Sequence, residues 1–220
     1  MNFLLKKSMD IIISSIFIVI FTPLCIIIAV AIKRDSKGPI LFKQKRLTKN
    51  GREFTMYKFR TMIENAEYMG TGLFNYENDF RVTKVGRLLR NTSLDELPQL
   101  INILKGDMAL IGPRPPVSYE LGKYENLNEA YKRRFTVLPG ITGLAQVKGR
   151  NELPWDEKVK FDNEYIDLFH KYGILIDLKI LALTIINVFK MKNIYEVEEE
   201  SSSIDITEKE EPLDEVFEKK

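Results

Sequence analysis

Cysteine and histidine are almost absent from this 220-residue chain, which contains one of each, Cys25 and His170. A single cysteine excludes an internal disulfide and a thiolate metal cluster. A single histidine excludes a zinc site built from several histidines and argues against a Ser-His-Asp triad. Any bound metal must therefore have oxygen ligands, which favours Mg²⁺ or Mn²⁺.

Acidic residues are scarce in most of the chain and concentrated at its end. Residues 195–220 contain 11 acids and 3 bases, a net charge of −8, so the formal charge of +2 for the whole chain leaves +10 on residues 1–194. The composition of residues 195–220 predicts an acidic, disordered tail. The basic remainder favours anionic partners, namely phosphates, anionic lipid or nucleic acid.

Charge is absent from residues 11–32, an apolar run long enough for a membrane helix. A secretory signal peptide is the alternative, because Lys6 and Lys7 precede the run. However, Lys33 and Arg34 follow it where a small-residue cleavage site is expected. The run therefore predicts a membrane segment.

The membrane segment has basic residues at both ends, so positive charge does not orient it across the bilayer. Pro23 lies near its middle and removes one helical hydrogen bond, while the Thr22 hydroxyl can bond a nearby carbonyl. Two half-helices of about 11 residues would each reach roughly 16 Å, about half of the hydrocarbon thickness. Two readings stay open: a segment that enters the membrane and returns at Thr22-Pro23, and a plain span with a proline kink.

Residues 37–194 predict one small α+β domain that is mainly helical. Asn50-Gly51 is a strong hairpin signal between two strand-like stretches, residues 40–47 and 53–62. Helices are expected within residues 64–78, 81–90, 98–105, 117–135, 155–170 and 174–190, and residues 138–151 predict a loop with a short strand. Asp177 and Lys179 make the last helix a buried or interfacial helix rather than a span.

Two adjacent carboxylates, Asp95 and Glu96, follow a stretch from residue 82 to residue 94 that contains no acid. Acids in the first turn of a helix stabilise its dipole and need no other role. Ser93 and Glu96 fit a capping box that would begin a helix there, although Pro98 suits a later start. Neighbours on a helix point about 100° apart, so the pair cannot share one proton, but one carboxylate could attack while the other holds a metal.

Four arginines, Arg87, Arg90, Arg114 and Arg150, lie in or beside predicted turns. The planar guanidinium matches phosphate oxygens in pairs, and Arg114 is stiffened by a proline on each side. Taken singly, each arginine is equally compatible with an ordinary surface turn. Together with the membrane segment, they predict a membrane-anchored protein with a phosphate-binding face.

Five motifs occur in order along the chain: residues 58–62 (KFRTM), 93–99 (SLDELPQ), 106–108 (GDM), 112–115 (GPRP) and 143–151 (GLAQVKGRN). From the N-terminus to residue 189 the chain resembles the bacterial sugar transferases, the monotopic polyprenyl-phosphate phosphoglycosyltransferases. Thr48 stands where the family usually has glycine, and Thr22-Pro23 stands where it often has Ser-Pro.

The resemblance implies transfer of a phospho-sugar from a UDP-sugar to undecaprenyl phosphate, with release of UMP. It implies Asp95 as the nucleophile, Glu96 as a ligand of Mg²⁺, and a re-entrant membrane segment. Lys58 and Arg60 of the first motif join the four arginines as candidate phosphate-binding residues. The expected location is the cytoplasmic face of the bacterial inner membrane.

The expected division of the chain is a re-entrant membrane hairpin (residues 1–36), a catalytic domain with interfacial amphipathic helices (37–194) and the acidic tail (195–220). Membrane lipids are expected partners and nucleic acid is not, while homodimer formation stays open. One rival is a metal-dependent glycosyltransferase that releases UDP, although the chain has no Asp-x-Asp motif. The other is a non-catalytic adaptor that binds anionic lipid. The sugar and the pathway are not readable from the chain.

Overall fold

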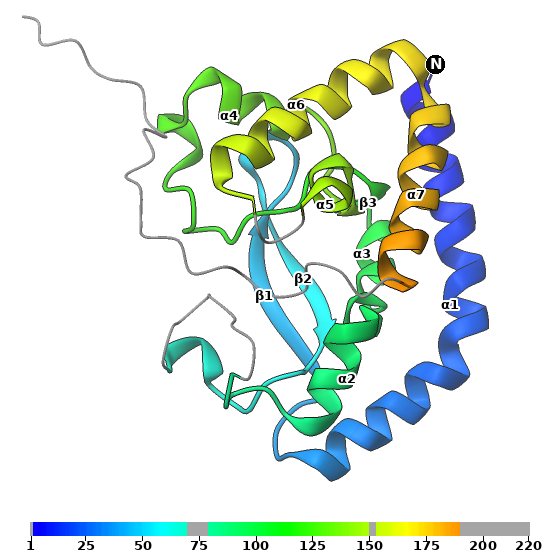
Figure 1. The fold of residues 1–220 in the computed structure, drawn as a ribbon, viewed down its shortest axis with the longest axis vertical. Coiled ribbons are helices and arrows are strands. Elements are labelled where there is room, and N and C mark those ends of the chain that lie inside the picture. The colour runs from blue at the N-terminus through cyan, green and yellow to red at the C-terminus, as the bar shows by residue number, and fades with distance from the viewer. Residues whose placement is uncertain (1, 70–78, 150–152, 190–220) are drawn as a thin grey trace, which may run out of the picture.

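A long N-terminal helix flanks a domain built around a β-hairpin (Figure 1). The computed structural model describes residues 2–69, 79–149 and 153–189, so the predicted acidic tail lies outside the described residues. The helices and strands are, in chain order, α1 (Asn2–Asp35), β1 (Leu41–Leu47), β2 (Glu53–Phe59), α2 (Lys84–Thr92), α3 (Gln99–Leu104), β3 (Ala109–Ile111), α4 (Glu129–Arg133), β4 (Gly140–Thr142), α5 (Leu144–Lys148), α6 (Trp155–Tyr172) and α7 (Ile174–Phe189). The fold is mainly helical, as the sequence predicts, and contains two small sheets, of which β1-β2 is the predicted hairpin.

Helix α1 is apolar and long enough to cross a membrane, and only 11% of its most apolar window is buried. It continues through Pro23 as one helix of 34 residues. Figure 1 shows that it changes direction about half-way along its length. Pro23 has no amide hydrogen, so it cannot donate the helical hydrogen bond to the Val19 carbonyl. The Thr22 hydroxyl does not replace that bond, because it donates to the Ile18 carbonyl at 2.6 Å. The chain therefore passes Pro23 as a bent, continuous helix rather than as two helices separated by a break.

The predicted hairpin is confirmed. Strands β1 and β2 pair antiparallel, and Asn50 (φ 60°) and Gly51 (φ 70°) form the turn between them. A Cβ atom at Gly51 would lie 2.3 Å from the Tyr124 ring, so this turn needs glycine for space as well as for its backbone conformation. The hairpin lies in the middle of the molecule (Figure 1), with Arg46 on β1 and Lys58 on β2.

Helix α3 lies between β2 and α1, and a buried amide fixes it to β2. The side chain of Asn102 accepts a hydrogen bond from the Tyr57 amide at 3.1 Å and donates one to the Thr55 carbonyl at 2.8 Å. Its exposed fraction is 0%. Because Lys58 follows Tyr57, this contact fixes the backbone that presents Lys58.

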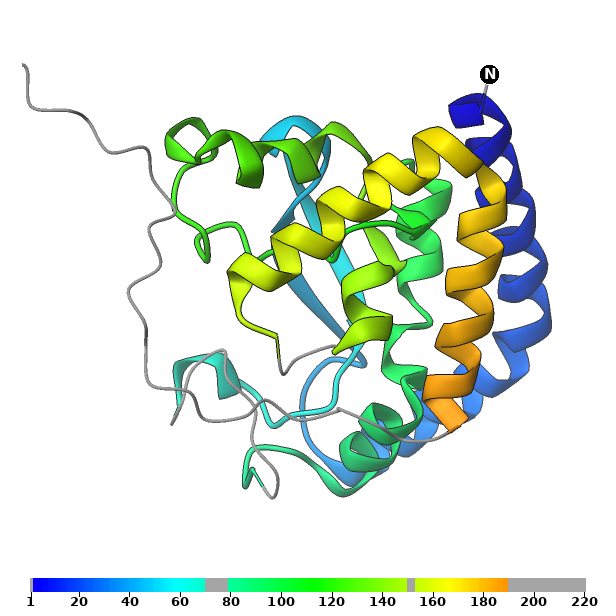
Figure 2. The ribbon, with the colours of Figure 1, turned by 45° about the horizontal axis from the view of Figure 1, so that its top comes forward.

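Helix α7 lies beside the N-terminal half of α1 in both views of the ribbon (Figures 1 and 2). The Lys6 ammonium of α1 is 2.6 Å from Asp177 Oδ2 of α7 and 3.4 Å from Asp10 Oδ2. Asp177 also accepts a hydrogen bond from the Tyr165 hydroxyl at 2.8 Å. Helix α7 is thus packed on one side, while Leu175, Leu178, Leu183, Ile185 and Ile186 leave its other side apolar and exposed.

Three helix predictions differ from the structure. Ser93 does not cap a new helix: its φ of 57° is left-handed, and it ends α2. Helix α3 begins later, after Pro98, as the proline position favoured. Residues 117–135 contain only the short α4 as α-helix, because Gly122 (φ 75°) interrupts the backbone before it. Within the helix predicted for residues 64–78, residues 66–68 form one 3-10 turn, and residues 70–78 lie outside the described residues.

Candidate active site

Asp95 and Glu96 lie on a single 3-10 turn, η3 (Leu94–Glu96), between α2 and α3. The left-handed Ser93 turns the chain at the end of α2, and Pro98 then starts α3. Left-handed backbone at a residue other than glycine costs free energy and is often found at functional sites. This reversal places both carboxylates against β2, with Asp95 only 8% exposed.

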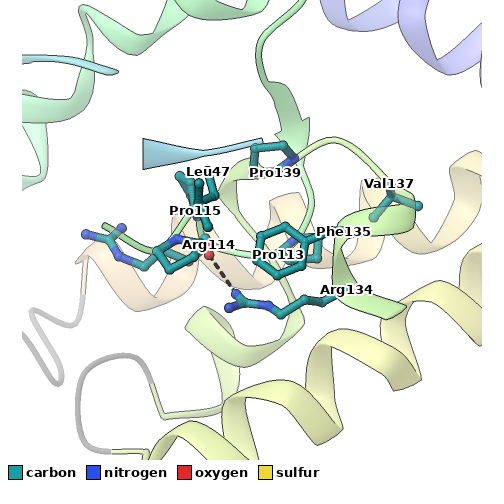
Figure 3. Close-up of a pocket in the computed structure, with 9 residues that line it drawn as sticks. Leu47, Pro113, Arg114, Pro115, Arg134, Phe135, Val137 and Pro139 are labelled. Atoms are coloured by element: carbon teal, nitrogen blue, oxygen red, sulfur yellow. Dashed lines mark hydrogen bonds between the residues drawn. The ribbon is translucent and has the colours of Figure 1, made fainter. Parts of the chain in front are cut away.

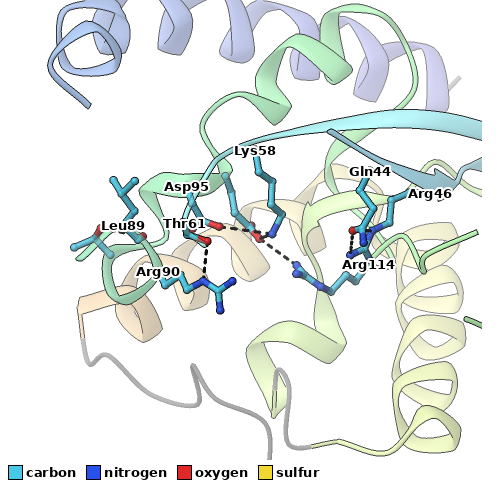
Figure 4. A network of polar contacts seen from close by, with 10 residues as sticks. Gln44, Arg46, Lys58, Thr61, Leu89, Arg90, Asp95 and Arg114 are labelled. Atoms are coloured by element: carbon cyan, nitrogen blue, oxygen red, sulfur yellow. Dashed lines mark hydrogen bonds and ion pairs between the residues drawn. The ribbon is translucent and has the colours of Figure 1, made fainter. Parts of the chain in front are cut away.

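Lys58 of β2 contacts both carboxylates (Figure 4). Its ammonium is 2.7 Å from Glu96 Oε1 and 3.7 Å from Asp95 Oδ2, and its side chain is 16% exposed. Arg114 approaches Glu96 from the other side, with Nη1 3.3 Å from Oε1. Two cationic side chains from distant parts of the sequence, Lys58 and Arg114, therefore meet at the acid pair.

Burial raises the pKa of the Asp95 carboxyl above its usual value. The positive charge of Lys58 opposes this rise, and the negative charge of Glu96 adds to it. Burial likewise lowers the pKa of the Lys58 ammonium, against the attraction of Glu96. A poorly solvated carboxylate is a stronger nucleophile than one in bulk water, and the nearby cations favour its ionised form.

Arg90 lies on α2 at the edge of this cluster. Its Nε donates to the Thr61 hydroxyl at 2.8 Å, and its charge is among those that lower the pKa of Asp95. Arg87 lies one turn earlier and is exposed. Within the described residues, Arg87 takes no part in the ion pairs that join Lys58 and Arg114 to the acid pair.

Arg60 has a different setting from the one predicted for it. Its buried guanidinium donates to the carbonyls of Ser36 (2.9 Å) and Lys37, just after the C-terminal end of α1. Strand β2 ends at Phe59, so the chain leaves the sheet and turns Arg60 toward α1 instead of toward the acid pair. Arg60 therefore attaches the membrane helix to the hairpin, which is a structural role. Arg150 lies outside the described residues.

Arg46 is part of this site and was missed by sequence reasoning. It lies on β1, donates to Gln44 Oε1 at 3.0 and 2.7 Å, and donates to the Pro115 carbonyl at 2.6 Å (Figure 4). Burial and, to a smaller extent, the positive charge of Arg114 lower its pKa to about 10. The signal that could have found it is the Gln-x-Arg-x-Gly-x-x-Gly stretch of the resembled family, in which Gln44 and Arg46 precede Thr48; charge alone could not, because Lys43 and Lys45 on the same strand are exposed.

The acid pair is the candidate source of oxygen ligands for a metal at this site. No group of three or more histidine, cysteine or acidic side chains able to hold a metal occurs among residues 2–69, 79–149 and 153–189. Mg²⁺ commonly uses only one or two carboxylates together with phosphate oxygens of a substrate. The donor chemistry of Asp95 and Glu96 fits that mode, with the phosphates supplied by a ligand.

The arrangement is suited to an anionic ligand. Three cationic side chains, Lys58, Arg90 and Arg114, surround one buried carboxylate and its neighbour. Such a field attracts phosphate and reduces the repulsion that a carboxylate meets when it approaches an anion. Nucleophilic attack on a phosphoryl group is the chemistry that this geometry favours.

Comparison with known proteins agrees with this chemistry. The family description "bacterial sugar transferase" matches residues 1–191. The chain is 42% identical over 198 residues to the UDP-glucose:undecaprenyl-phosphate glucose-1-phosphate transferase of Klebsiella pneumoniae, covering 88% of this chain and 42% of the relative. It is 42% identical over 176 residues to the undecaprenyl-phosphate galactose phosphotransferase of Salmonella typhimurium, covering 74% and 36%.

A shorter relative matches over most of its length. The chain is 42% identical over 192 residues to the uncharacterized sugar transferase EpsL of Bacillus subtilis, covering 87% of this chain and 90% of the relative. By contrast, the chain spans less than half the length of the Klebsiella and Salmonella enzymes. The match over residues 1–191 of the 220 shows that this chain belongs to the bacterial sugar transferase family.

Proposed function

We propose that the protein transfers a phospho-sugar from a UDP-sugar to undecaprenyl phosphate and releases UMP. The observation that carries this proposal is the buried Asp95, with Lys58 3.7 Å away and Arg90 and Arg114 among the nearby charges. Relatives about 40% identical are named for this type of transfer with glucose, galactose or N-acetylgalactosamine. The reaction would be a membrane step in the synthesis of a bacterial glycoconjugate, such as a capsule, an O-antigen, an exopolysaccharide or a glycoprotein.

The proposed mechanism has two displacements at one phosphorus atom. A carboxylate oxygen of Asp95 attacks the phosphorus that carries the sugar, and the bond to the bridging oxygen of the diphosphate breaks, so UMP leaves with that oxygen. A phosphate oxygen of undecaprenyl phosphate then attacks the same phosphorus and releases the Asp95 carboxylate. Lys58 and Arg114 supply positive charge where the phosphate oxygens lie during both steps.

We propose Mg²⁺ as the cofactor, with Glu96 as its protein ligand. When bound, Mg²⁺ would neutralise charge on the diphosphate and assist departure of UMP. In the structure the Glu96 carboxylate already contacts Lys58 and Arg114 through Oε1, so its charge is balanced before any ligand binds. Loss of UMP release in EDTA, with recovery on adding Mg²⁺, is the expected result. Full activity in EDTA would remove the metal from the proposal.

We propose that α1 enters the membrane and returns, with the catalytic domain on the cytoplasmic face of the inner membrane. The Lys6 end of α1 is ion-paired with α7, and the carbonyls just beyond its other end are bound by Arg60. A helix with both ends attached to one domain is unsuited to placing those ends on opposite sides of a bilayer. The expected result is that cysteines introduced at Asn2 and Lys37 react with an impermeant reagent only from the cytoplasmic side. Labelling of one end from the periplasm would support a plain span.

The test of the reaction is a panel of UDP-sugars, incubated with the purified protein and undecaprenyl phosphate in nanodiscs. UMP is the expected nucleotide product, and one sugar or a small group of sugars should react fastest. Release of UDP would instead support a glycosyltransferase that moves the sugar without its phosphate. Failure to release either nucleotide, with retained binding to anionic vesicles, would support the adaptor.

The pH dependence of turnover tests the role of Lys58. Asp95 must be ionised to attack, so kcat/KM should rise with pH through the pKa of Asp95. Lys58 lowers that pKa, so Lys58→Met should raise it and move the acidic limb of the profile to higher pH. Activity at neutral pH should fall by about 10²-fold, the effect of removing one positioned donor.

The control for this variant is Lys105→Met, which removes the hydrogen bond from Lys105 to the Tyr57 hydroxyl at the neighbouring position of β2. It should keep both the rate and the acidic limb of the wild-type protein. The same acidic limb in Lys58→Met and in the wild type would contradict the assignment of that limb to Asp95.

A further inference from the structure

The segment that carries Arg114 is poorly able to hold itself in place. Residues 113, 115 and 116 are prolines, which have no amide hydrogen to donate to neighbouring carbonyls. Yet Arg114 must be placed closely, because its Nη1 lies 3.3 Å from Glu96 Oε1. Donors from outside the segment are therefore needed to fix it.

Four successive carbonyls of this segment each accept a hydrogen bond from another part of the chain. The pairs are Pro113 with the Gly140 amide (2.9 Å), Arg114 with Arg134 Nη2 (2.7 Å), Pro115 with Arg46 Nη1 (2.6 Å) and Pro116 with the Leu47 amide (3.1 Å). The two central donors are arginine side chains, one on each side of the segment. We call Arg46 and Arg134 the carbonyl clamp.

Figure 3 shows Arg134 donating to the Arg114 carbonyl, and further contacts hold the Arg134 guanidinium. Its Nη2 is 2.9 Å from Asp162 Oδ2 of α6, and both side chains are 2% exposed. Its guanidinium also lies 4.9 Å from the centre of the Trp155 ring. Arg134, Pro113, Pro115 and Phe135 line one small cavity, so Arg134 lies beside the proline segment on this side.

Arg46 is held from the opposite side by Gln44, whose Oε1 accepts from both Nε and Nη2. Its charge is unfavourable at this position, because burial and the positive charge of Arg114 lower the pKa of Arg46 and the charges of Glu120 and Glu96 offset only part of that effect. A neutral donor would satisfy the Pro115 carbonyl without that repulsion. The second charge does, however, add to the positive field that an anionic ligand meets.

We propose that Arg46 and Arg134 are positioning residues that hold Arg114 through the carbonyls of Arg114 and Pro115. This inference rests on the proposed function, because it assumes that Arg114 binds the diphosphate of the donor. A displacement of about 1 Å at a group that positions substrate can lower a rate by about 10²-fold. The clamp therefore acts on catalysis only through Arg114.

The competing reading is that both arginines serve only the fold. A double-mutant cycle with Arg114→Ala separates the two readings. If the clamp acts through Arg114, its loss lowers kcat/KM for the UDP-sugar in the wild-type background and has no further effect once Arg114 is gone. If the clamp serves only the fold, the two losses multiply and the melting temperature falls with activity.

The clamp variants are Arg46→Gln and the pair Arg134→Met with Asp162→Asn, which removes both charges so that no unpaired carboxylate is left buried. Each should lower kcat/KM by about tenfold to 10²-fold. Lys45→Gln is the matched control for Arg46. Arg133→Met with Asp167→Asn is the control for the pair, because Arg133 and Asp167 form an exposed ion pair between the same two regions. Both controls should keep wild-type kinetics.

Binding of inorganic pyrophosphate, measured by calorimetry, tests the clamp without turnover. Both clamp variants should bind about tenfold more weakly than the wild type, and Arg114→Ala should abolish that difference. If the clamp variants bind pyrophosphate more weakly in this way but the wild-type protein releases no UMP, the proposed function is refuted and the positioning role of the clamp still stands. The positioning role of the clamp is overturned if the clamp variants bind pyrophosphate and react as the wild type does. It is also overturned if their losses multiply with the loss caused by Arg114→Ala. A wild-type protein that neither binds pyrophosphate nor turns over would overturn it as well.

Discussion

Asp95→Asn is expected to abolish UMP release, with a loss of at least about 10⁴-fold, because an amide cannot form the acyl-phosphate bond. The variant should also fail to form the covalent phospho-sugar adduct that mass spectrometry would detect on the wild-type protein with a UDP-sugar and no acceptor. The expected site of that adduct is Asp95 alone. A variant that makes lipid-linked sugar at the wild-type rate would remove the covalent mechanism.

The same variant is expected to be at least as stable as the wild type. Burial raises the pKa of Asp95 above its value in the unfolded chain, so the folded state prefers the protonated form. Stability from this group is therefore present at low pH and lost as pH rises through the folded-state pKa. A neutral amide of the same shape avoids that loss at pH 7, and Lys58 keeps its closer partner Glu96 at 2.7 Å. An unchanged or higher melting temperature would show that lost activity is not lost folding.

The control for both measurements is Glu129→Gln, which neutralises a carboxylate whose side chain is 83% exposed. It should change neither the rate nor the melting temperature. The claim that the buried Asp95 carboxylate lowers stability would be contradicted if Asp95→Asn lowered the melting temperature and Glu129→Gln did not.

The acid pair was found from the sequence because its chemistry is unusual, not because its local structure was read correctly. Two adjacent carboxylates after a stretch without acids made the pair a candidate, the family resemblance gave the pair its predicted roles, and in the structure Lys58 and Arg114 contact it. The capping-box reading of Ser93 was wrong because the pattern of residue types does not record the sign of φ. Ser93 takes a left-handed conformation that ends one helix instead of starting the next.

Arg60 shows the limit of grouping residues by motif. It is two positions after Lys58, so in an extended strand both side chains would share a face. The strand ends at Phe59, and the next residue turns to the end of α1. Where a strand stops depends on what packs beyond it, and the sequence of the strand does not contain that information.

Arg46 and Arg134 were not predicted, for a related reason. Each is one cation among several in its stretch of sequence, and nearby cations such as Lys45 and Arg133 are exposed. What distinguishes the two buried arginines is a partner far along the chain: the Pro115 carbonyl in one case and Asp162 in the other. Contacts between distant segments become visible only when the fold is known.

Lys6→Met is expected to be the most destabilising single change among those considered for α1. Lys6 lies within 2.6 Å of Asp177 Oδ2 and 3.4 Å of Asp10 Oδ2, and all three side chains are 10–11% exposed. Without the ammonium, two nearly buried carboxylates remain without a counter-charge, which costs about 3–5 kcal/mol. The melting temperature of the protein in nanodiscs should fall by about 10 °C.

Lys7→Met is the matched control, because Lys7 is the exposed neighbour on the same helix, and it should melt with the wild type. Adding Asp177→Asn to Lys6→Met should restore part of the loss, since one uncompensated charge is removed. Burial raises the pKa of Asp177, against the charge of Lys6, so mild acid should stabilise Lys6→Met more than the wild type. Equal melting temperatures for Lys6→Met and Lys7→Met would mean that this ion pair does not hold α1 against α7. Only the C-terminal end of α1 would then be shown to be attached to the domain, through Arg60. One of the two contacts that favour a returning membrane segment would be lost.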